Sequence, residues 1–427
     1  MRETDTARRK VVVVGQGYVG LPLAHAATEA GHLVVGLDLD QGRVDSLNAG
    51  RSVIDDTTDD DVAAMRARGY YASTSASEYS DADVVVICVP TPLGSGAEPD
   101  LRAVRAAAAA IAREISENTL VILESTTYPG TTANELVPIL EAATGFTCGR
   151  DLFVAFSPER IDPGNKVFGI RNTPKVVGAD DGGSLRRAQE FYEGFIDQVV
   201  PVSGTAEAEL SKLLENTYRH INIGLVNELA IVCHELGIDV WEVIRAAATK
   251  PFGFQAFYPG PGVGGHCIPI DPNYLNYQAR QVLDRPFRFV ELAQDINSDM
   301  PAYVVSRAQD LLNDQRKSLK GSKVLLLGVT YKSGVSDTRE SPADDVAELL
   351  LDKGAEVSFY DPNVETWQLQ SGHSMARVAD VQHMSKTSDL TILLQLIPGL
   401  DLEDLAANTP LFFDTRGVTR SPQAVRL

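Results

Sequence analysis

The sequence predicts an α/β protein with two Rossmann-like, doubly wound domains joined by a central domain of long helices. Two observations predict the outer domains: a strand–helix–strand pattern near residues 10–39, and a similar pattern near residues 323–362. A third predicts the middle, because residues 206–247 carry apolar residues at three- and four-residue steps and contain no proline. We therefore expect domains at 1–203, 204–316 and 317–427.

The N-terminal elements follow from apolar runs and their glycine boundaries. Residues 10–15 are typical of a buried parallel strand, residues 21–30 of a helix that ends at Gly31, and residues 32–39 of a second strand. Three such elements within about thirty residues form a βαβ unit with a right-handed crossover. Further strands are expected at 82–89, 120–124 and 152–156, with helices between them.

The C-terminal pattern repeats the first one without its glycine spacing. A strand is expected from Lys323, a helix near 342–353 and a second strand near 354–362. Because the glycine spacing is missing, we expect this domain to bind something other than a dinucleotide pyrophosphate. The long helices of the middle must bury an apolar stripe, either in a homodimer or against another part of the same chain. We expect the homodimer, and the intrachain role stays open.

Composition narrows the class of protein. The 427 residues are 44% hydrophobic and 22% charged, as in soluble globular proteins, and the net charge of −20 argues against nucleic-acid binding. The acidity can also serve solubility alone, and a local basic pocket can still hold a small anion. No apolar stretch reaches the length of a membrane span, so no membrane association is expected. The four cysteines are Cys88, Cys148, Cys233 and Cys267. They lack zinc-type or CxxC spacing, so we expect no metal site and a protein of the reducing cytoplasm.

A dinucleotide site is predicted at residues 15–20, whose GQGYVG sequence matches GxGxxG between a strand and a helix. Glycines allow the turn and the approach of a pyrophosphate, and the helix amides attract the anion. Asp38 follows about twenty residues later, where its carboxylate can bind a ribose 2′-hydroxyl and repel a 2′-phosphate, so NAD is expected over NADP. A glycine turn without a ligand is the alternative. The predicted contacts here are Gly15, Gly17, Tyr18, Val19, Gly20 and Asp38, with Arg43 as a secondary contact near the adenosine.

A catalytic loop is predicted at residues 257–273, FYPGPGVGGHCIPIDPN, where glycines and prolines surround Cys267. Such a segment favours neither helix nor strand, and shaped loops on rigid scaffolds often carry function. A reactive thiolate needs nearby donors or positive charge. The other three cysteines are expected to serve packing or the surface, and His266 is interpreted as loop structure rather than as a metal ligand or base.

Seven motifs resemble those of the UDP-glucose/GDP-mannose dehydrogenase family. They run in family order over nearly the whole chain: GQGYVGLPLA, VPTPL, ESTTYPGTT, SPERIDPG, KLLENTYRHINIGLVNELA, PGPGVGGHCIPIDP and YKSGVSDTRES. The resemblance implies a cytoplasmic enzyme of nucleotide-sugar metabolism that oxidises a sugar 6-hydroxyl to a carboxylate with two NAD molecules in turn. It also implies a thiohemiacetal and then a thioester on the cysteine, which is nucleophilic catalysis that retains the aldehyde.

The resemblance assigns roles to six residues. Cys267 matches the nucleophile, Lys212 the lysine that stabilises oxyanion charge, and Asn216 the asparagine that orients the substrate. Lys212 and Asn216 are four residues apart, so they share a helix face. Asp271 matches the aspartate that is linked to the lysine through a water and takes part in proton removal. Glu159 matches the glutamate that assists thioester hydrolysis, and Thr126 matches the threonine that positions the attacking water.

Further contacts are implied by the same resemblance. The additional cofactor contacts are Pro90, Thr91, Ser125, Thr126 and Arg339. The substrate contacts are Glu159, Lys212, Asn216, Phe257, Tyr258, Gly264, Lys332 and Arg416, of which the two cations Lys332 and Arg416 suit a diphosphate. Glu340 and Ser341 are interpreted as the start of a helix.

The sugar is less well specified. SPERIDPG departs from the SPEFL-type string of UDP-glucose enzymes, with Pro163 in place of a second glutamate, and resembles the bacterial branch that oxidises UDP-N-acetylhexosamines, UDP-GlcNAc above all. UDP-glucose and dTDP-glucose remain alternatives, as an acetamide adds only a few contacts.

Two other classes of protein are alternatives to this reaction. A two-electron β-hydroxyacid-type dehydrogenase would need neither the Cys267 loop nor the second α/β domain. An inactive NAD- or sugar-binding regulator would have no use for the nucleophile.

Overall fold

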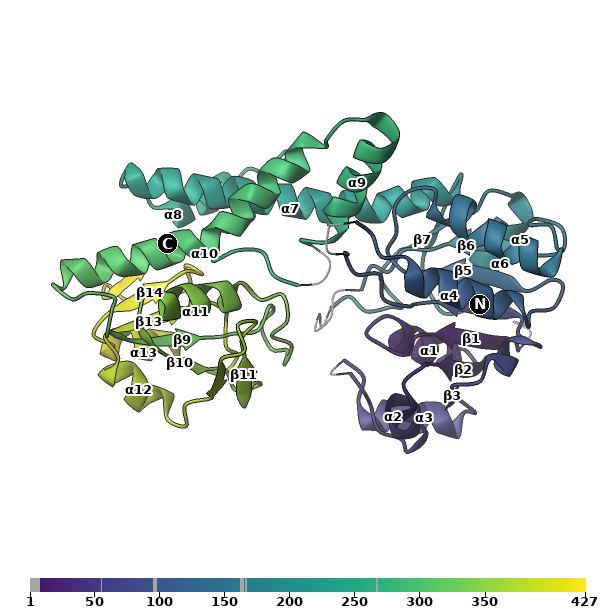
Figure 1. Ribbon diagram of the computed structural model, residues 1–427, viewed down its shortest axis with the longest axis horizontal. Coiled ribbons are helices and arrows are strands. Elements are labelled where there is room, and N and C mark those ends of the chain that lie inside the picture. The colour runs from purple at the N-terminus through teal and green to yellow at the C-terminus, as the bar shows by residue number, and fades with distance from the viewer. Residues whose placement is uncertain (1–7, 55, 95–97, 162–164, 166, 266–267) are drawn as a thin grey trace. The chain divides into compact units, whose positions relative to one another are not determined.

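The computed structural model describes residues 8–54, 56–94, 98–161, 165, 167–265 and 268–427. The chain divides into two compact units (Figure 1). The first contains Met1–Glu215 and Asn273–Arg285, and the second contains Asn216–Pro272 and Pro286–Leu427. Within the described ranges, no helix combines the length and the apolar character required to cross a bilayer.

The first unit is built on a sheet with strand order β3-β2-β1-β4-β5-β6-β7-β8. The neighbouring strands are parallel except for the antiparallel pair β6 and β7. Because β1 lies between β2 and β4, the strand order reverses there, and the carboxyl ends of β1 and β4 are where ligands of such sheets bind. The strands are β1 (Lys10–Val14), β2 (Leu33–Leu37), β3 (Tyr71–Ser73), β4 (Val84–Ile87), β5 (Leu120–Leu123), β6 (Phe153–Phe156), β7 (Lys175–Gly178) and β8 (Val199–Val202).

Helices cover both faces of this sheet, which explains the unbroken valine run of β1. Val11 and Val13 belong to one buried cluster, whereas Val12 and Val14 belong to another on the opposite face. The helical elements are α1 (Gly20–Glu29), α2 (Gln41–Asn48), α3 (Asp59–Ala67), η1 (Ala76–Tyr79), α4 (Arg102–Ala112), η2 (Thr132–Leu136), α5 (Val137–Thr144) and α6 (Gly182–Tyr192). The predicted βαβ unit and the three further strands are confirmed, with ends that differ by up to two residues.

The helical middle contains α7 (Thr205–Glu235), α8 (Val240–Ala247), α9 (Asp271–Leu283) and α10 (Arg288–Asp314). The expectation of one or two long helices over 206–247 is confirmed by α7 and the shorter α8. Sequence reasoning did not predict α10, which continues through Pro301. In the second unit α10 packs against α11 (Figure 1).

The C-terminal sheet has strand order β10-β9-β13-β14-β15, and all of its neighbouring strands are parallel. The switch in direction lies at β9, between β10 and β13, so the carboxyl ends of β9 and β13 border a crevice. The strands are β9 (Lys323–Leu327), β10 (Glu356–Tyr360), β13 (Leu390–Leu393), β14 (Phe412–Asp414) and β15 (Ala424–Arg426), with a hairpin of β11 (Thr366–Gln368) and β12 (Ser374–Ala376). The helices are α11 (Pro342–Asp352), α12 (Val381–Thr387) and α13 (Leu402–Asn408). Two Rossmann-like domains and a long-helix middle are thus confirmed.

Glu209 anchors α7 to the N-terminal domain. Its buried carboxylate accepts hydrogen bonds from Gly130 N at 2.5 Å, Thr132 N at 2.8 Å and Thr132 Oγ1 at 2.7 Å. Burial raises the pKa of Glu209 to about 7, against the opposing effect of these donors. The contact fixes the segment that leads from β5 into η2.

We predict a pH-dependent stability contribution from Glu209. Its pKa is about 7 in the folded protein and 4.5 in the unfolded chain, so between these values the folded state holds a proton that the unfolded state has released. The free energy of unfolding should therefore fall, relative to that of Glu209→Gln, by up to about 1.4 kcal/mol per pH unit as pH rises through this window. Denaturant unfolding across the window measures this, with Glu207→Gln, an exposed neighbour on α7, as the control. Parallel pH profiles for wild type and Glu209→Gln would contradict the prediction.

Candidate active site

The glycine turn between β1 and α1 has the shape expected of a pyrophosphate cradle. Gly15 has φ +92°, and a Cβ there would lie 2.6 Å from the carbonyl oxygen of Cys88. A Cβ on Gly20 would lie 1.8 Å from the carbonyl oxygen of Gly15, whereas one on Gly17 would meet nothing within 4 Å. The first and third glycines are therefore required by packing, and the second leaves the backbone open to a ligand. At the start of α1, Val19 supplies no side-chain cap to the amides.

Asp38 is fixed beside this turn, directly after β2. Its Oδ2 accepts hydrogen bonds from Gln16 N at 2.9 Å and from Arg43 Nη1 at 3.0 Å, and its Oδ1 accepts one from Asp40 N at 3.0 Å. Gln16 is itself held by Tyr70, whose hydroxyl donates to Gln16 Oε1 at 2.9 Å. The carboxylate is thus oriented before any ligand binds, with Arg43 as its ion-pair partner.

The other predicted cofactor contacts of the first unit lie at the same edge of the sheet. Pro90 and Thr91 follow β4, and Ser125 and Thr126 follow β5, which is the strand next to β4. The hydroxyl of Ser125 donates to the carbonyl oxygen of Val89 at 2.7 Å and so ties the two loops together. Ser125 is buried and Thr126 is half-buried. Parallel strands end together, so the topology brings these segments to the glycine turn.

Arg339 belongs to the second unit, and its role as a cofactor contact stays a prediction. Its guanidinium is exposed and pairs with Asp337 at 2.7 Å. Two residues later Ser341 caps α11 by accepting from Ala343 N at 3.3 Å, so its interpretation as a helix start is confirmed.

Lys212 and Asn216 lie on successive turns of α7, and each makes a hydrogen bond to a predicted site segment. Within the first unit, Lys212 Nζ donates to the carbonyl oxygen of Glu159 at 2.6 Å. Within the second unit, Asn216 Nδ2 donates to Asp271 Oδ2 at 2.5 Å. Asp271 is buried at the first position of α9, at the end of the predicted catalytic loop.

Glu159 directs one carboxylate oxygen at the backbone, and its other oxygen has an ion-pair partner but no hydrogen bond among the described residues. Its Oε1 accepts from the amide of Ile161, whereas its buried Oε2 accepts no hydrogen bond from any described residue. The nearest cation to Oε2 is Lys175, whose Nζ lies 3.8 Å away. Buried polar atoms are normally hydrogen-bonded, so an orphan carboxylate oxygen is a sign of function.

Sequence reasoning missed Glu209, Glu124 and Lys175 as partners of the site. Glu209 precedes Lys212 by three residues and therefore shares its helix face, which is a signal that the sequence offers. Glu124 and Lys175 are brought together only by the tertiary fold, and nothing in their local sequence marks them.

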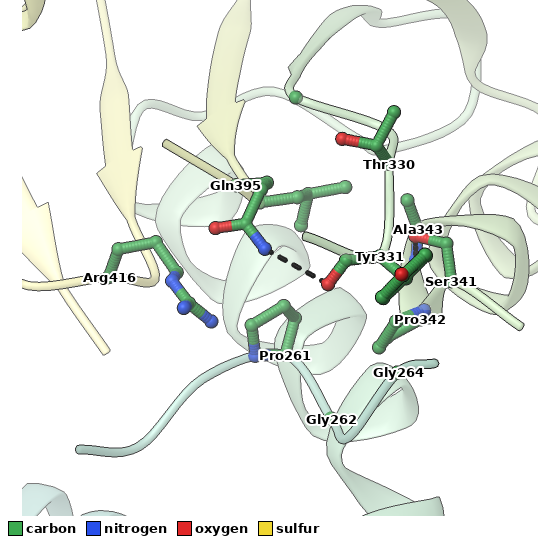
Figure 2. Close-up of a pocket in the computed structure, with 12 residues that line it drawn as sticks. Pro261, Gly262, Gly264, Thr330, Tyr331, Ser341, Pro342, Ala343, Gln395 and Arg416 are labelled. Carbon is green, nitrogen blue, oxygen red and sulfur yellow. Dashed lines mark hydrogen bonds between the residues drawn. The ribbon is translucent and has the colours of Figure 1, made fainter. Parts of the chain in front are cut away.

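A pocket in the second unit lies between the glycine-rich loop and the C-terminal sheet (Figure 2). A Cβ on Gly264 would lie 2.8 Å from Pro342 Cδ, and Gly265 N donates to the carbonyl oxygen of Glu340 at 3.0 Å, so the loop is packed closely there. On the opposite side Gln395 Nε2 donates to the carbonyl oxygen of Tyr331 at 3.2 Å. The lining residues are Pro261, Gly262, Gly264, Gly328, Thr330, Tyr331, Ser341, Pro342, Ala343, Leu394, Gln395 and Arg416.

Arg416 supplies the positive charge of this pocket. It follows β14, and its backbone amide donates to Asp414 Oδ1 at 2.9 Å. Burial lowers the pKa of the Arg416 guanidinium, against the opposing charge of Asp414. Among the described residues the guanidinium donates no hydrogen bond and forms no ion pair. An arginine held in this way is suited to an anionic ligand.

Three other predicted substrate contacts lie outside the lining of this pocket. Lys332 is half-buried, two residues beyond Thr330 in the same loop. Phe257 packs edge-on against another ring of the second unit, and Tyr258 stacks on Trp241 with centroids 6.0 Å apart. Cys267 and His266 lie outside the described residues, so the position of the predicted nucleophile stays a prediction.

Family models match the three parts of the chain. The NAD binding domain, the central domain and the UDP binding domain of the UDP-glucose/GDP-mannose dehydrogenase family match residues 9–196, 206–299 and 325–421. The first match confirms NAD as the cofactor and an oxidoreductase as the class of enzyme.

Named relatives are similar to this chain over most of their length. A UDP-N-acetyl-D-glucosamine 6-dehydrogenase of Pseudomonas aeruginosa is 35% identical over 382 residues, covering 88% of this chain and 87% of that protein. A UDP-N-acetyl-D-mannosamine dehydrogenase of Methanococcus maripaludis is 35% identical over 366 residues, covering 84% and 81%. The solved UDP-D-ManNAc dehydrogenase of Pyrococcus horikoshii has a TM-score of 0.88 at 29% identity, covering 98% of both chains. This chain belongs to the UDP-glucose/GDP-mannose dehydrogenase family.

Proposed function

We propose that this protein oxidises the 6-hydroxymethyl group of a UDP-N-acetylhexosamine, UDP-GlcNAc first among them, to a carboxylate. The observation that carries this proposal is the face of α7. There Lys212 binds the backbone of Glu159, and Asn216 binds the carboxylate of Asp271. A cation, a proton acceptor and an orienting amide are the groups that oxidation of an alcohol requires.

The chain's own residues carry the proton and acyl chemistry. NAD, when bound, accepts a hydride from the sugar carbon, and two molecules are used for each sugar. Asp271, held by Asn216, accepts the hydroxyl proton in the first oxidation, and the Lys212 ammonium stabilises negative charge on oxygen. The Cys267 thiolate bonds to the aldehyde carbon, and oxidation of this thiohemiacetal gives a thioester that water cleaves to the acid.

The cofactor cradle suits NAD rather than NADP. The carboxylate of Asp38 is fixed by Gln16 and Arg43 with lone pairs still able to accept from a ribose hydroxyl. A 2′-phosphate at that position would meet the carboxylate and be repelled, because two anions at short range destabilise each other.

The pocket beside Arg416 suits the diphosphate of the nucleotide sugar. It lies at the direction switch of the C-terminal sheet, where ligands of α/β domains bind, and it contains a guanidinium without a carboxylate partner among the described residues. We assign Lys332 to the same ligand as a second cation.

The names of relatives support an N-acetylated sugar, since the Pseudomonas aeruginosa protein is named for UDP-GlcNAc and the two archaeal proteins are named for UDP-ManNAc. Pro163, the position that departs from the UDP-glucose pattern, lies outside the described residues. UDP-glucose and dTDP-glucose are the second candidates, because the nucleotide contacts do not depend on the acetamide.

We also propose that the protein is a homodimer through α7. Apolar side chains form an exposed stripe on this helix and at the residue that follows it: Leu214, Leu225 and Val232 of α7 and Leu236 directly after its end are 63%, 59%, 45% and 67% exposed. Their spacings of 11, 7 and 4 residues place them on one face of a helix. Monomers rarely leave such a stripe in water, and a second copy would bury it.

The reaction is tested by counting NADH over a panel of UDP- and dTDP-sugars. The proposal predicts two NADH per sugar consumed and fastest turnover with UDP-GlcNAc or UDP-ManNAc. Cys267→Ser should abolish acid formation and leave NAD and UDP binding unchanged. Cys148→Ser is the matched control, because burial raises the pKa of that thiol to about 11 and keeps it unreactive. One NADH per sugar, or near-normal acid production by Cys267→Ser, would refute the covalent route.

Asp38→Asn should weaken NAD and relax the rejection of NADP. Loss of a charged hydrogen bond to the ribose costs about 1.5–3 kcal/mol, which raises KM for NAD about 10- to 100-fold. Steady-state kinetics with both cofactors measure the preference. Asp45→Asn, on the nearby α2 and hydrogen-bonded to Gln41, should behave as wild type. An unchanged preference would show that the ribose lies elsewhere.

Arg416→Gln should raise KM for the UDP-sugar about 10- to 100-fold, because a charge-assisted contact to the diphosphate is removed. KM for NAD should not change. Arg420→Gln, at an exposed arginine four residues later, is the control. Equal KM values for the sugar nucleotide in wild type and Arg416→Gln would place the diphosphate outside this pocket.

A further inference from the structure

A buried lysine in the first unit is shared by two carboxylates. Lys175 Nζ lies 3.0 Å from Glu124 Oε2 and 3.8 Å from Glu159 Oε2, and the three side chains are 5%, 0% and 11% exposed. Such charges stay buried only when they are paired, because removing one partner leaves an uncompensated ion. The cluster therefore behaves as a unit with a net charge of −1 when both carboxylates are ionised.

Each member is held by the fold, apart from one atom. Glu124 follows β5, and its Oε1 accepts from the hydroxyl of Tyr192 on α6. Lys175, the first residue of β7, also donates to the carbonyl oxygen of Pro158 at 3.3 Å. The exception is Glu159 Oε2, which accepts no hydrogen bond from any described residue and has the Lys175 ammonium 3.8 Å away as its ion-pair partner.

Resting on the proposed function, we infer that Lys175 and Glu124 are positioning residues that hold the Glu159 carboxylate in place for thioester hydrolysis. In that step the water oxygen bonds to the thioester carbonyl carbon and one water proton passes to Glu159 Oε2. The carbon–sulfur bond then breaks, and its electron pair stays on Cys267 as thiolate. The product acid and the Glu159 carboxyl group then each release a proton to solvent, which restores the Glu159 carboxylate. No oxidant or reductant is consumed.

The charges around Glu159 determine the direction of each effect. Lys212 Nζ donates a hydrogen bond to the backbone oxygen of Glu159 at 2.6 Å, and Arg160 forms an ion pair with Glu215 at 2.8 Å. Burial raises the pKa of the Cys88 thiol well above its usual range, so that group stays neutral. Burial lowers the pKa of Lys175, but the two carboxylates outweigh it and keep the lysine charged. Lys175 therefore stabilises the negative charge of the Glu159 carboxylate, and the negative charge of Glu124 opposes it.

Three variants of the full-length enzyme test this. Lys175→Met changes the cluster charge to −2, Glu124→Gln changes it to 0, and the double variant Lys175→Met/Glu124→Gln restores −1. In Lys175→Met the first turnover should still release two NADH per site, because both oxidations precede hydrolysis. Steady-state turnover at neutral pH should fall about tenfold, and intact-protein mass should show the acyl group on Cys267. The pH at which turnover is lost on the acid side should be about one unit higher in Lys175→Met than in wild type. It should be lower in Glu124→Gln and close to the wild-type value in the double variant.

An unchanged acid limb in all three variants would overturn the inference, as would loss of the first-turnover NADH together with the steady rate in Lys175→Met. Should Lys175→Met fail to fold, the downward shift in Glu124→Gln remains a sufficient test. Failure of the proposed function is recognised separately in wild type, by one NADH per sugar or by the absence of any acyl adduct on Cys267.

Discussion

The spacing of polar residues on one face of α7 is the constraint from which the candidate site follows. Glu209, Lys212 and Asn216 are three and four residues apart, so they project on successive turns of the same helix. Glu209 accepts from the loop after β5, Lys212 donates to the backbone of Glu159, and Asn216 donates to Asp271. The first two contacts lie within the first unit, and the third lies within the second unit.

Placement of cations, rather than overall charge, connects this site to anionic ligands. The chain has a net charge of −20, yet Lys175 and Arg416 are both held in sheltered positions. They differ in their partners. Lys175 is paired with two carboxylates, whereas Arg416 lines a pocket and has no carboxylate partner among the described residues, which is why we propose it as the ligand contact. An acidic surface limits nonspecific binding of polyanions and does not hinder such a pocket.

The fold was largely predictable, because its signals are local. The valine run of β1, the glycines that follow it and Asp38 lie within one βαβ unit, and the same pattern marks the C-terminal domain. The helix α10 was missed because it continues through Pro301, a residue that normally ends a helix. The strands β7 and β8 were also not predicted, because each has only four residues and β7 begins with the buried Lys175.

The site was predictable only in part. Sequence motifs gave the proposed site residues, and the residues that meet them only in three dimensions were not predicted. Glu124 and Lys175 are fifty-one positions apart and meet only because β5, β6 and β7 are neighbours in the sheet. The covalent role that we propose for Cys267 rests on the motif that surrounds it.

A crystal structure of the Cys267→Ser variant with NAD and UDP-GlcNAc tests the central claim most directly. The quantity to measure is the distance from the serine Oγ to C6 of the sugar. We expect van der Waals contact between these atoms, with C6 also facing the nicotinamide. We expect the diphosphate to bind Arg416. A sugar whose C6 lies away from residue 267, or a diphosphate bound elsewhere, would contradict it.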